Sequence, residues 1–199
     1  MKAGAIILSG GKSSRMGTNK ALLKINDKPN IERIRDALKE YFNEIILVTN
    51  EPKRYEFLGL KITSDQYPGM GPLAGLHAGL MASEADINLL AACDMPFVSG
   101  ELASALAARC QGYDAVIPVI DGKQHPLFAV YHKSAAKAAE ACIKTGNLRM
   151  KHLLDQLNVL YLTEKEFGSF SQLDIEKNFF NMNHPSEYED AKRQAESDR

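Results

Sequence analysis

Cysteine is scarce in this sequence, and the three that occur form no recognisable pair. Cys93, Cys110 and Cys142 are widely spaced and odd in number. This usage argues against a framework of disulfide bonds, and we expect reduced thiols in a cytoplasmic protein, with Cys93 as a packing residue that ends an apolar run. The five histidines show none of the short spacings that bind metal, so the sequence does not support a zinc site.

The sequence also lacks a strong net charge and any long hydrophobic run. Its formal net charge is -1, which argues against nucleic acid as the main partner, because proteins that bind it usually carry a broad basic face. No apolar run approaches the length that crosses a membrane. The apolar start is cut short at Gly10 and Gly11 and is followed by basic residues rather than by a cleavage site, so we expect no signal peptide.

Short apolar runs alternate with amphipathic segments along the chain. Strands are predicted at residues 3–8, 44–49, 60–64, 87–93, 113–118, 127–131 and 158–162. Helices are predicted at residues 31–42, 72–83, 100–110, 134–144 with Ser134 as N-cap, 148–156, and 186–196 after Pro185. Continuous apolar strands separated by helices indicate an α/β fold, a Rossmann-like three-layer sandwich with a mostly parallel sheet. Without a repeat, a low-complexity stretch or a linker, residues 1–199 are expected to form a single domain.

A segment rich in glycine, serine and basic residues follows the first predicted strand. It reads Leu8-Ser9-Gly10-Gly11-Lys12-Ser13-Ser14-Arg15-Met16-Gly17-Thr18-Asn19-Lys20. Its glycines let the backbone approach an anion closely, and Arg15 and Lys20 supply positive charge. No acidic residue precedes Asp27, so the local field is positive. The segment therefore predicts a polyphosphate-binding loop, with a solvated surface turn as the alternative.

Two common phosphate-binding motifs do not fit this loop. A Walker A loop needs a glycine five residues before Gly11, where Ile6 stands, and the glycines at 10, 11 and 17 do not match the dinucleotide fingerprint. The spacing L-S-G-G-x-x-x-R-M-G-x-x-K instead resembles the signature loop of the molybdenum cofactor guanylyltransferases, a family of nucleotidyltransferases. The common family form has alanine where Ser9 stands. Because the loop is expected to act through its backbone, we expect this departure to matter little.

The resemblance implies a nucleotidyltransferase fold, and transfer of GMP from GTP to molybdopterin with release of pyrophosphate. It implies GTP contacts by Leu8, Ser9, Gly10, Gly11, Lys20, Asn50, Asp65, Gly71 and Asp94, and catalytic roles for Arg15, Lys20 and Asp94 in positioning and charge neutralisation. The nucleotide-binding half would cover residues 1–100 and the half for the pterin substrate residues 101–199. The implied protein partners are molybdenum cofactor synthesis or delivery proteins and apo-molybdoenzymes.

Asp94 is the strongest individual candidate for chemistry. It follows an apolar strand and precedes Met95-Pro96, where the chain must turn. A carboxylate there suits Mg²⁺, which prefers oxygen ligands and shares its shell with phosphates and water; in the family the aspartate of this element binds Mg²⁺ and the nucleotide. The alternative is that Asp94 caps the next helix, a role for which Ser99 is better placed.

Other polar residues also follow predicted strands. Asn50 and Asp65 stand at such ends, where each could equally be a turn residue. Ligands of parallel sheets bind beyond the carboxyl ends of the strands, so we expect both residues to share one edge with Leu8 and Asp94.

The run Gly69-Met70-Gly71-Pro72-Leu73-Ala74-Gly75-Leu76 reads as a tight loop that enters a helix. The start of that helix could bind an anion through free N–H groups, and it resembles the same element of the family. Close helix packing at Gly75 and Gly79 is the alternative, and the two interpretations are compatible.

The second half of the chain contains weaker signals. His125-Pro126, Arg149 and Asn181-Met182-Asn183 resemble family elements near the second substrate, and Asn181 and Asn183 alternate as on an extended segment. Both asparagines are therefore candidates for the pterin pocket. His125 by itself reads as a loop or packing residue rather than as a catalyst.

Alternative functions remain open at this stage. The chain could use CTP on molybdopterin, act on a sugar or polyol phosphate, or bind nucleotides or a partner without catalysis. The form L-S-G-G, rather than the cytidylyl-type L-A-A-G, favours guanine.

Overall fold

The computed structural model describes residues 3–10, 19–168 and 170–197 of the protein. One sheet contains β1 (Ala3–Leu8), β4 (Glu44–Val48), β5 (Lys61–Thr63), β6 (Ile87–Ala92), β7 (Ala115–Ile120), β8 (Lys123–Gln124), β9 (Phe128–His132) and β10 (Val159–Thr163). Its strands run in the order β10-β7-β9-β6-β1-β4-β5, with β8 paired to β7. A separate hairpin is formed by β2 (Lys24–Ile25) and β3 (Lys28–Pro29).

The predicted mostly parallel sheet is confirmed. Strands β6, β1, β4 and β5 pair in parallel, as do β7 and β10. Strand β9 is the exception within the main path, because it runs antiparallel to both β6 and β7. The four adjacent parallel strands therefore end at one common edge.

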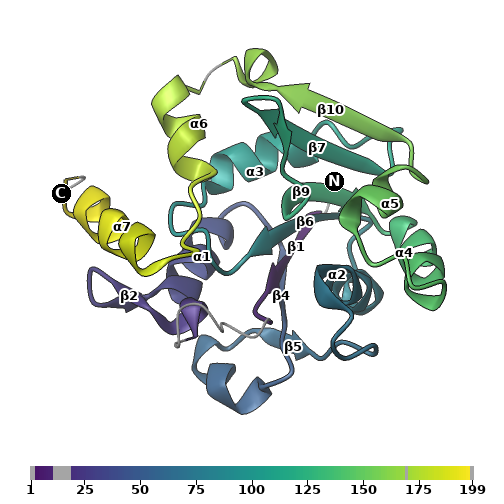
Figure 1. Ribbon diagram of the computed structural model, residues 1–199, viewed down its shortest axis with the longest axis horizontal. Coiled ribbons are helices and arrows are strands. Elements are labelled where there is room, and N and C mark those ends of the chain that lie inside the picture. Colours follow the sequence, from purple (N-terminus) through teal and green to yellow (C-terminus); the bar gives the residue numbers. More distant parts are fainter. Residues whose placement is uncertain (1–2, 11–18, 169, 198–199) are drawn as a thin grey trace.

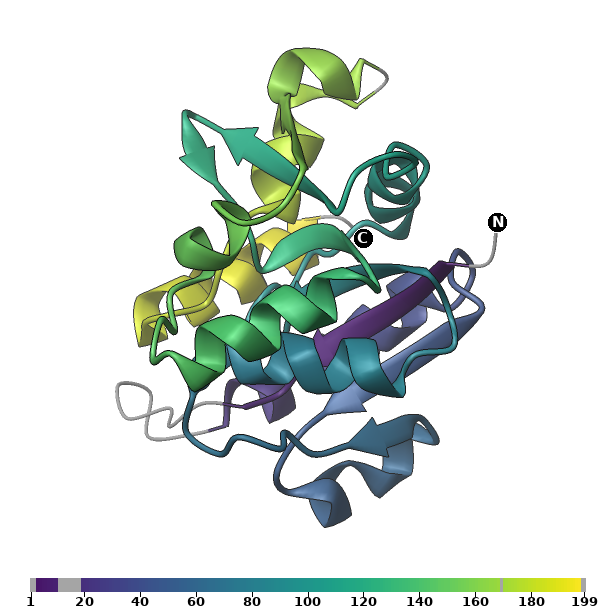
Figure 2. The ribbon, with the colours of Figure 1, turned by 90° about the vertical axis from the view of Figure 1, so that its right-hand side faces the viewer.

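Helices cover both faces of this sheet (Figures 1 and 2). On one side lie α1 (Asn30–Leu38), α3 (Gly100–Ala107) and α6 (Gln172–Asn178), and on the other α2 (Gly71–Ala82), α4 (Ala135–Lys144) and α5 (Met150–Leu154). The last helix, α7 (Pro185–Ser197), lies beside the β2–β3 hairpin. The 3-10 helices are η1 (Lys20–Leu22), η2 (Pro52–Leu58) and η3 (Glu164–Phe167). In the described part of the chain, no helix is both long and apolar enough to cross a membrane.

Strand β1 shows how the sequence produces three layers. Successive side chains of a strand point to opposite faces. Ala5 and Ile7 belong to the core cluster under α1 and α3, whereas Ile6 belongs to the cluster under α2 and α4. All three are at most 1% exposed. Such a fully apolar strand is stable only when both of its faces are covered.

Helix α2 packs very closely on β1. A Cβ added to Gly79 would stand 2.4 Å from Ile6 Cγ2, and one added to Gly75 would stand 2.9 Å from Leu8 Cδ2. Real Cβ atoms are essentially never found this close to a neighbour, so an added Cβ would displace Ile6 or the end of the Leu8 side chain. The structure thus supports the packing interpretation of both glycines.

Several predicted boundaries need correction. Strand β7 covers residues 115–120 rather than 113–118, and α7 begins at Pro185 itself. Ser134 does precede α4, but its side chain makes no capping bond within the described part of the chain. Its hydroxyl instead donates to Asp114 Oδ1 at 2.8 Å, and Asp114 Oδ2 accepts from the Asn158 backbone N–H at 3.0 Å. Asp114 therefore links the residues that directly precede β7, β10 and α4.

Candidate functional site

Four candidate site residues lie at the carboxyl ends of the parallel strands β1, β4, β5 and β6. Leu8, the last residue of β1, pairs with Val48 of β4 and with Ala92 of β6. The Ser9 backbone N–H then donates to Val48 O at 3.0 Å. Asn50, Asp65 and Asp94 follow β4, β5 and β6, so the expected shared edge is present.

A contact between three distant segments lies at this edge. The Lys20 ammonium stands 3.7 Å from Asp94 Oδ2 and donates to Asn183 Oδ1 at 2.9 Å. The Lys20 and Asp94 side chains are only 18% and 24% exposed. The structure thus joins a predicted phosphate-binding residue, a predicted metal ligand and a candidate for the second substrate.

The Asp94 carboxyl group is poorly solvated. Burial raises its pKa, while the nearby charge of Lys20 acts in the opposite direction. Asp94 Oδ1 is buried and has no hydrogen-bond partner among the described residues. The hydroxyl of Ser99 accepts from Leu102 N at 3.2 Å and so caps α3, as expected. Ser99 rather than Asp94 therefore caps α3, and Asp94 offers a carboxylate oxygen that suits a cation.

Backbone contacts hold the Asp94 turn in place. The Asn30 side chain, which is fully buried, donates to Cys93 O at 2.8 Å, and the Cys93 N–H donates to Leu8 O at 3.1 Å. The Met182 N–H donates to Asp94 O at 2.9 Å. The last of these bonds anchors the C-terminal segment at the site.

The Cys93 thiol lies beside this turn but is not activated. Burial, together with the charge of Asp94, raises its pKa to about 12. The thiolate is the reactive form, so the thiol stays neutral at pH 7. This agrees with the interpretation of Cys93 as a packing residue.

Asn50 and Asp65 form a mutual pair at the ends of β4 and β5. Asn50 Nδ2 donates to Asp65 Oδ2 at 2.9 Å, and the Asp65 N–H donates to Asn50 Oδ1 at 3.3 Å. Asp65 Oδ1 is buried without a hydrogen-bond partner in the ranges that the structure describes. The pair can therefore still accept a hydrogen bond from a ligand.

Helix α2 starts at Gly71, whose φ of +72° suits glycine. Met70 at the N-cap offers no capping side-chain bond from the described residues, and Pro72 occupies the first turn. A helix start of this kind attracts anions through its N–H groups and its dipole.

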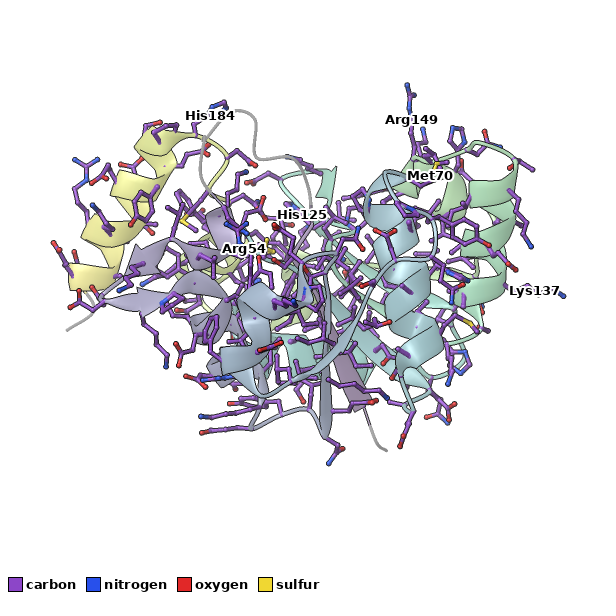
Figure 3. The ribbon with its side chains drawn as sticks, turned by 90° about the horizontal axis from the view of Figure 1, so that it is seen from below. Arg54, Met70, His125, Lys137, Arg149 and His184 are labelled. Atoms are coloured by element: carbon purple, nitrogen blue, oxygen red, sulfur yellow. The ribbon has the colours of Figure 1, made fainter. Side chains whose placement is uncertain are left out.

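The candidates from the second half are only partly brought together. Asn183 reaches Lys20, whereas Asn181 Nδ2 donates to Phe179 O at 2.8 Å. His125 packs against the Phe179 ring at a centroid distance of 4.6 Å, and burial lowers its pKa. This supports the interpretation of His125 as a packing residue. Arg149 is exposed and extends away from the body of the protein (Figure 3).

Two predicted site residues, Gly11 and Arg15, lie outside the described residues. Sequence reasoning also missed a residue near the site. Tyr55 lies in a charged stretch that resembles surface, yet it is 1% exposed, and its hydroxyl contacts both Ser9 and Asn19. A large aromatic residue among charges was the only available signal.

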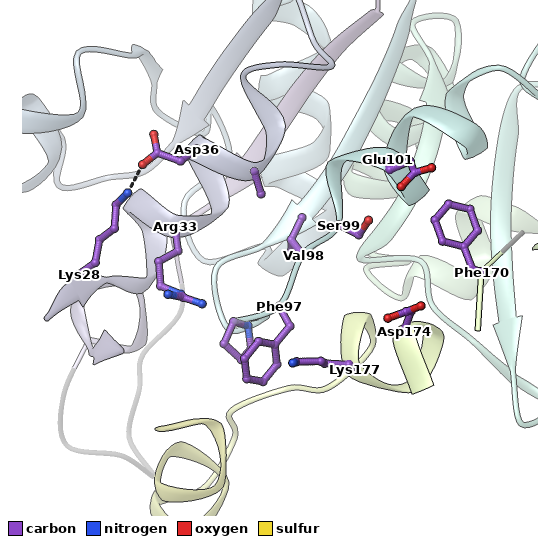
Figure 4. A pocket seen from close by; sticks show the side chains of 12 residues that line it. Lys28, Arg33, Asp36, Phe97, Val98, Ser99, Glu101, Phe170, Asp174 and Lys177 are labelled. Carbon is purple, nitrogen blue, oxygen red and sulfur yellow. Dashed lines mark hydrogen bonds and ion pairs between the residues drawn. The ribbon is translucent and has the colours of Figure 1, made fainter. Parts of the chain in front are cut away.

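The described residues form no metal cage at the site, and a cavity of the structure lies away from it. No group of three or more His, Cys, Asp or Glu that could hold a metal occurs among residues 3–10, 19–168 and 170–197. A cavity of about 510 Å³ lies between α1, α3, α6 and the 96–99 turn (Figure 4). It is lined by Lys28, Arg33, Asp36, Phe97, Glu101, Asp174, Lys177 and their neighbours. None of the described site residues lines this cavity.

Comparison with known families agrees with this geometry. The model of the MobA-like NTP transferase domain matches residues 5–160, which include strands β1, β4, β5 and β6 and the Asp94 turn. The chain belongs to this family. The predicted resemblance and nucleotidyltransferase class are therefore confirmed.

Relatives match nearly the whole chain. A probable molybdenum cofactor guanylyltransferase of Pelotomaculum thermopropionicum is 36% identical over 199 residues, which is 100% of this chain and 96% of the relative. Another, of Peptoclostridium acidaminophilum, is 40% identical over 90% of this chain and 83% of its own length. The crystal structure of molybdopterin-guanine dinucleotide biosynthesis protein A from Archaeoglobus fulgidus superposes with a TM-score of 0.84 at 29% identity, covering 98% of this chain and 99% of that one. The predicted fold is thus confirmed, while the roles of individual site residues stay predictions.

Proposed function

We propose that the protein is a cytoplasmic molybdenum cofactor guanylyltransferase, which transfers GMP from GTP to the phosphate of molybdopterin and releases pyrophosphate. The observation that carries this proposal is the meeting of Lys20, Asp94 and Asn183 at the carboxyl edge of the sheet. Full-length relatives that bear this name support the choice of substrates.

The proposed reaction is a displacement at the α-phosphorus of GTP. An oxygen of the molybdopterin phosphate forms a bond to this phosphorus. The bond to the oxygen that bridges the α- and β-phosphates breaks, and its electrons leave with pyrophosphate. The attacking phosphate is already ionised, so the protein has to align the substrates and offset charge rather than remove a proton.

Lys20 and Asp94 would carry the charge balance. Lys20 lies next to Asp94 and places a positive charge near the triphosphate, with Arg15 proposed to add a second. Asp94 would hold Mg²⁺ through Oδ1, the buried oxygen that lacks a hydrogen-bond partner among the described residues. An Mg²⁺ ion held by Asp94 would supply charge neutralisation for the α-phosphate and for departing pyrophosphate.

The remaining candidates would bind the substrates. We assign Leu8, Ser9, Gly10, Gly11, Asn50, Asp65 and Gly71 to GTP, and Asn181 and Asn183 to the pterin substrate. Residues 1–100 would thus serve the nucleotide and residues 101–199 molybdopterin. Proteins that synthesise or deliver the cofactor, and apo-molybdoenzymes, would be the protein partners.

A nucleotide panel followed by a turnover assay tests the proposal. GTP with Mg²⁺ should stabilise the protein against heat more than CTP, ATP or UTP at equal concentration, by at least ~1 kcal/mol, about one hydrogen bond to the base edge. Pyrophosphate release should then require GTP, Mg²⁺ and molybdopterin together. A larger shift with CTP would identify a cytidylyltransferase, and no shift with any nucleotide would contradict an enzymatic role.

A further inference from the structure

A buried tyrosine hydroxyl lies where the nucleotide-binding segment leaves the sheet. Tyr55, in η2, is 1% exposed and packs in the large core cluster. Its hydroxyl stands 2.6 Å from Ser9 Oγ and accepts from Asn19 Nδ2 at 2.8 Å. Ser9 directly follows β1, and Asn19 directly precedes η1. One hydroxyl therefore joins two polar side chains that are ten positions apart in the sequence.

The contact with Asn19 leads directly to Lys20. Asn19 Oδ1 accepts from the Ala21 N–H at 3.1 Å, which makes Asn19 the side-chain cap of η1. Lys20 is the first residue of that turn. Because the amide nitrogen of Asn19 is held by Tyr55, the orientation of the cap depends on the Tyr55 hydroxyl. The position of η1 then determines where the Lys20 ammonium lies, beside Asp94.

Packing alone does not account for the Tyr55 hydroxyl. Phenylalanine would fill the same space, but Asn19 Nδ2 and Ser9 Oγ would lose this partner. Ser9 is itself 6% exposed, so its hydroxyl is largely shielded from water. The serine at position 9 therefore makes a contact that alanine could not make, which argues against our expectation that this departure from the common family form matters little.

We propose that Tyr55 is a positioning residue for nucleotide binding. Its hydroxyl ties Ser9 to Asn19 and, through the Asn19 cap, sets the position of Lys20 relative to Asp94. This inference rests on the proposed nucleotide-binding function, and it does not depend on which base is recognised. It predicts that loss of the Tyr55 hydroxyl weakens the contact of Lys20 with phosphate and leaves the contacts to the nucleoside intact.

The test compares binding of a nucleoside triphosphate with binding of its nucleoside. Isothermal titration with Mg²⁺ uses whichever triphosphate stabilises the unaltered chain most, for Tyr55→Phe, Lys20→Ala and the double variant. Tyr55→Phe should weaken triphosphate binding by about fivefold or more, the worth of one hydrogen bond, and nucleoside binding by less than about twofold. In the Lys20→Ala background, Tyr55→Phe should add less than about twofold, because its effect acts through Lys20.

Tyr131→Phe is the matched control. Tyr131 is fully buried and its hydroxyl donates to Pro126 O at 2.8 Å, in the other half of the sheet. This variant should lose thermal stability and keep triphosphate affinity. If Tyr55→Phe does not fold, Asn19→Ser keeps an oxygen that can cap η1 but removes the amide that donates to Tyr55, and it should show the same dependence on Lys20.

The outcomes separate this inference from the proposed function. Unchanged triphosphate affinity in Tyr55→Phe or its substitute would overturn the positioning role, as would equal losses for triphosphate and nucleoside. An undiminished effect of Tyr55→Phe in the Lys20→Ala background would also overturn it. Base preference and pyrophosphate release by the unaltered chain report on the proposed function instead.

Discussion

Replacing Asp94 with asparagine should reduce turnover while leaving the protein at least as stable. Asp94→Asn keeps the size and the hydrogen-bonding capacity of the side chain and removes its charge. The side chain is 24% exposed, and its carboxylate is disfavoured by burial even with Lys20 3.7 Å away. An ionised carboxylate that is this buried costs the fold free energy. Such a group is typical of a site that binds a ligand.

The direction of the stability change follows from the pKa. Burial raises the pKa of Asp94 in the folded state above its unfolded value. Its contribution to stability is therefore present at low pH and is lost as pH rises through the folded pKa. The ionised carboxylate is therefore a cost to the folded protein, and asparagine does not carry this cost. We expect the melting temperature of ligand-free Asp94→Asn to equal or exceed that of the wild type at pH 7.

The direction of the activity change follows from charge. Two unit charges 4 Å apart interact by about 4 kcal/mol at an effective dielectric constant of about 20, of which competing water and ions leave only a part. We expect at least ~1.4 kcal/mol of transition-state stabilisation to be lost, about tenfold in the rate of pyrophosphate release from GTP and molybdopterin.

Asp114→Asn provides the matched control for Asp94. The Asn158 backbone N–H and the Ser134 hydroxyl lower the pKa of Asp114, so its charge stabilises the fold at pH 7. This variant should have a lower melting temperature than the wild type and a normal turnover rate below that temperature. Near-normal turnover in Asp94→Asn, or a clear loss of its stability, would refute the assignment of Asp94 as the essential ligand.

The strand ends of the candidate site could be predicted from the sequence. Continuous apolar runs such as Ile87–Ala92 read as buried strands, and parallel strands end at one edge by geometry. Asn50, Asp65 and Asp94 were found in this way. The antiparallel direction of β9 was not predicted, because an apolar run carries no information about which way the strand runs.

Contacts between segments far apart in the chain could not be predicted from the sequence. Lys20 and Asn183 are separated by 163 positions, and no local pattern predicts that their side chains meet. Their contact depends on Met182, which is fully buried with Ile25 and Ala191 in a small cluster between the β2–β3 hairpin and α7. The hairpin was missed because its strands are only two residues long. Short elements of this kind are held by tertiary packing rather than by periodicity.

Three further predictions concern charge and packing. Lys20→Ala should weaken GTP binding by at least about tenfold and guanosine binding much less, because the ammonium addresses phosphate; titration with GTP, GDP and guanosine checks this, and equal losses would contradict it. Gly79→Ala should lower the melting temperature despite the better helix propensity of alanine, because its Cβ would stand 2.4 Å from Ile6 Cγ2. Asp36 is partly buried, which alone would raise its pKa, but its bonds to Lys28, Lys39 and Arg35 lower the pKa to about 2 from 3.8. The stability from Asp36 is therefore present above the unfolded pKa and falls away as pH drops toward 2, by about 1 kcal/mol once solvent screening is allowed for. Urea unfolding at pH 6 and pH 3 should show Asp36→Asn less stable than the wild type at pH 6 with the gap narrowing at pH 3, and a constant gap would show that the charge of Asp36 does not contribute.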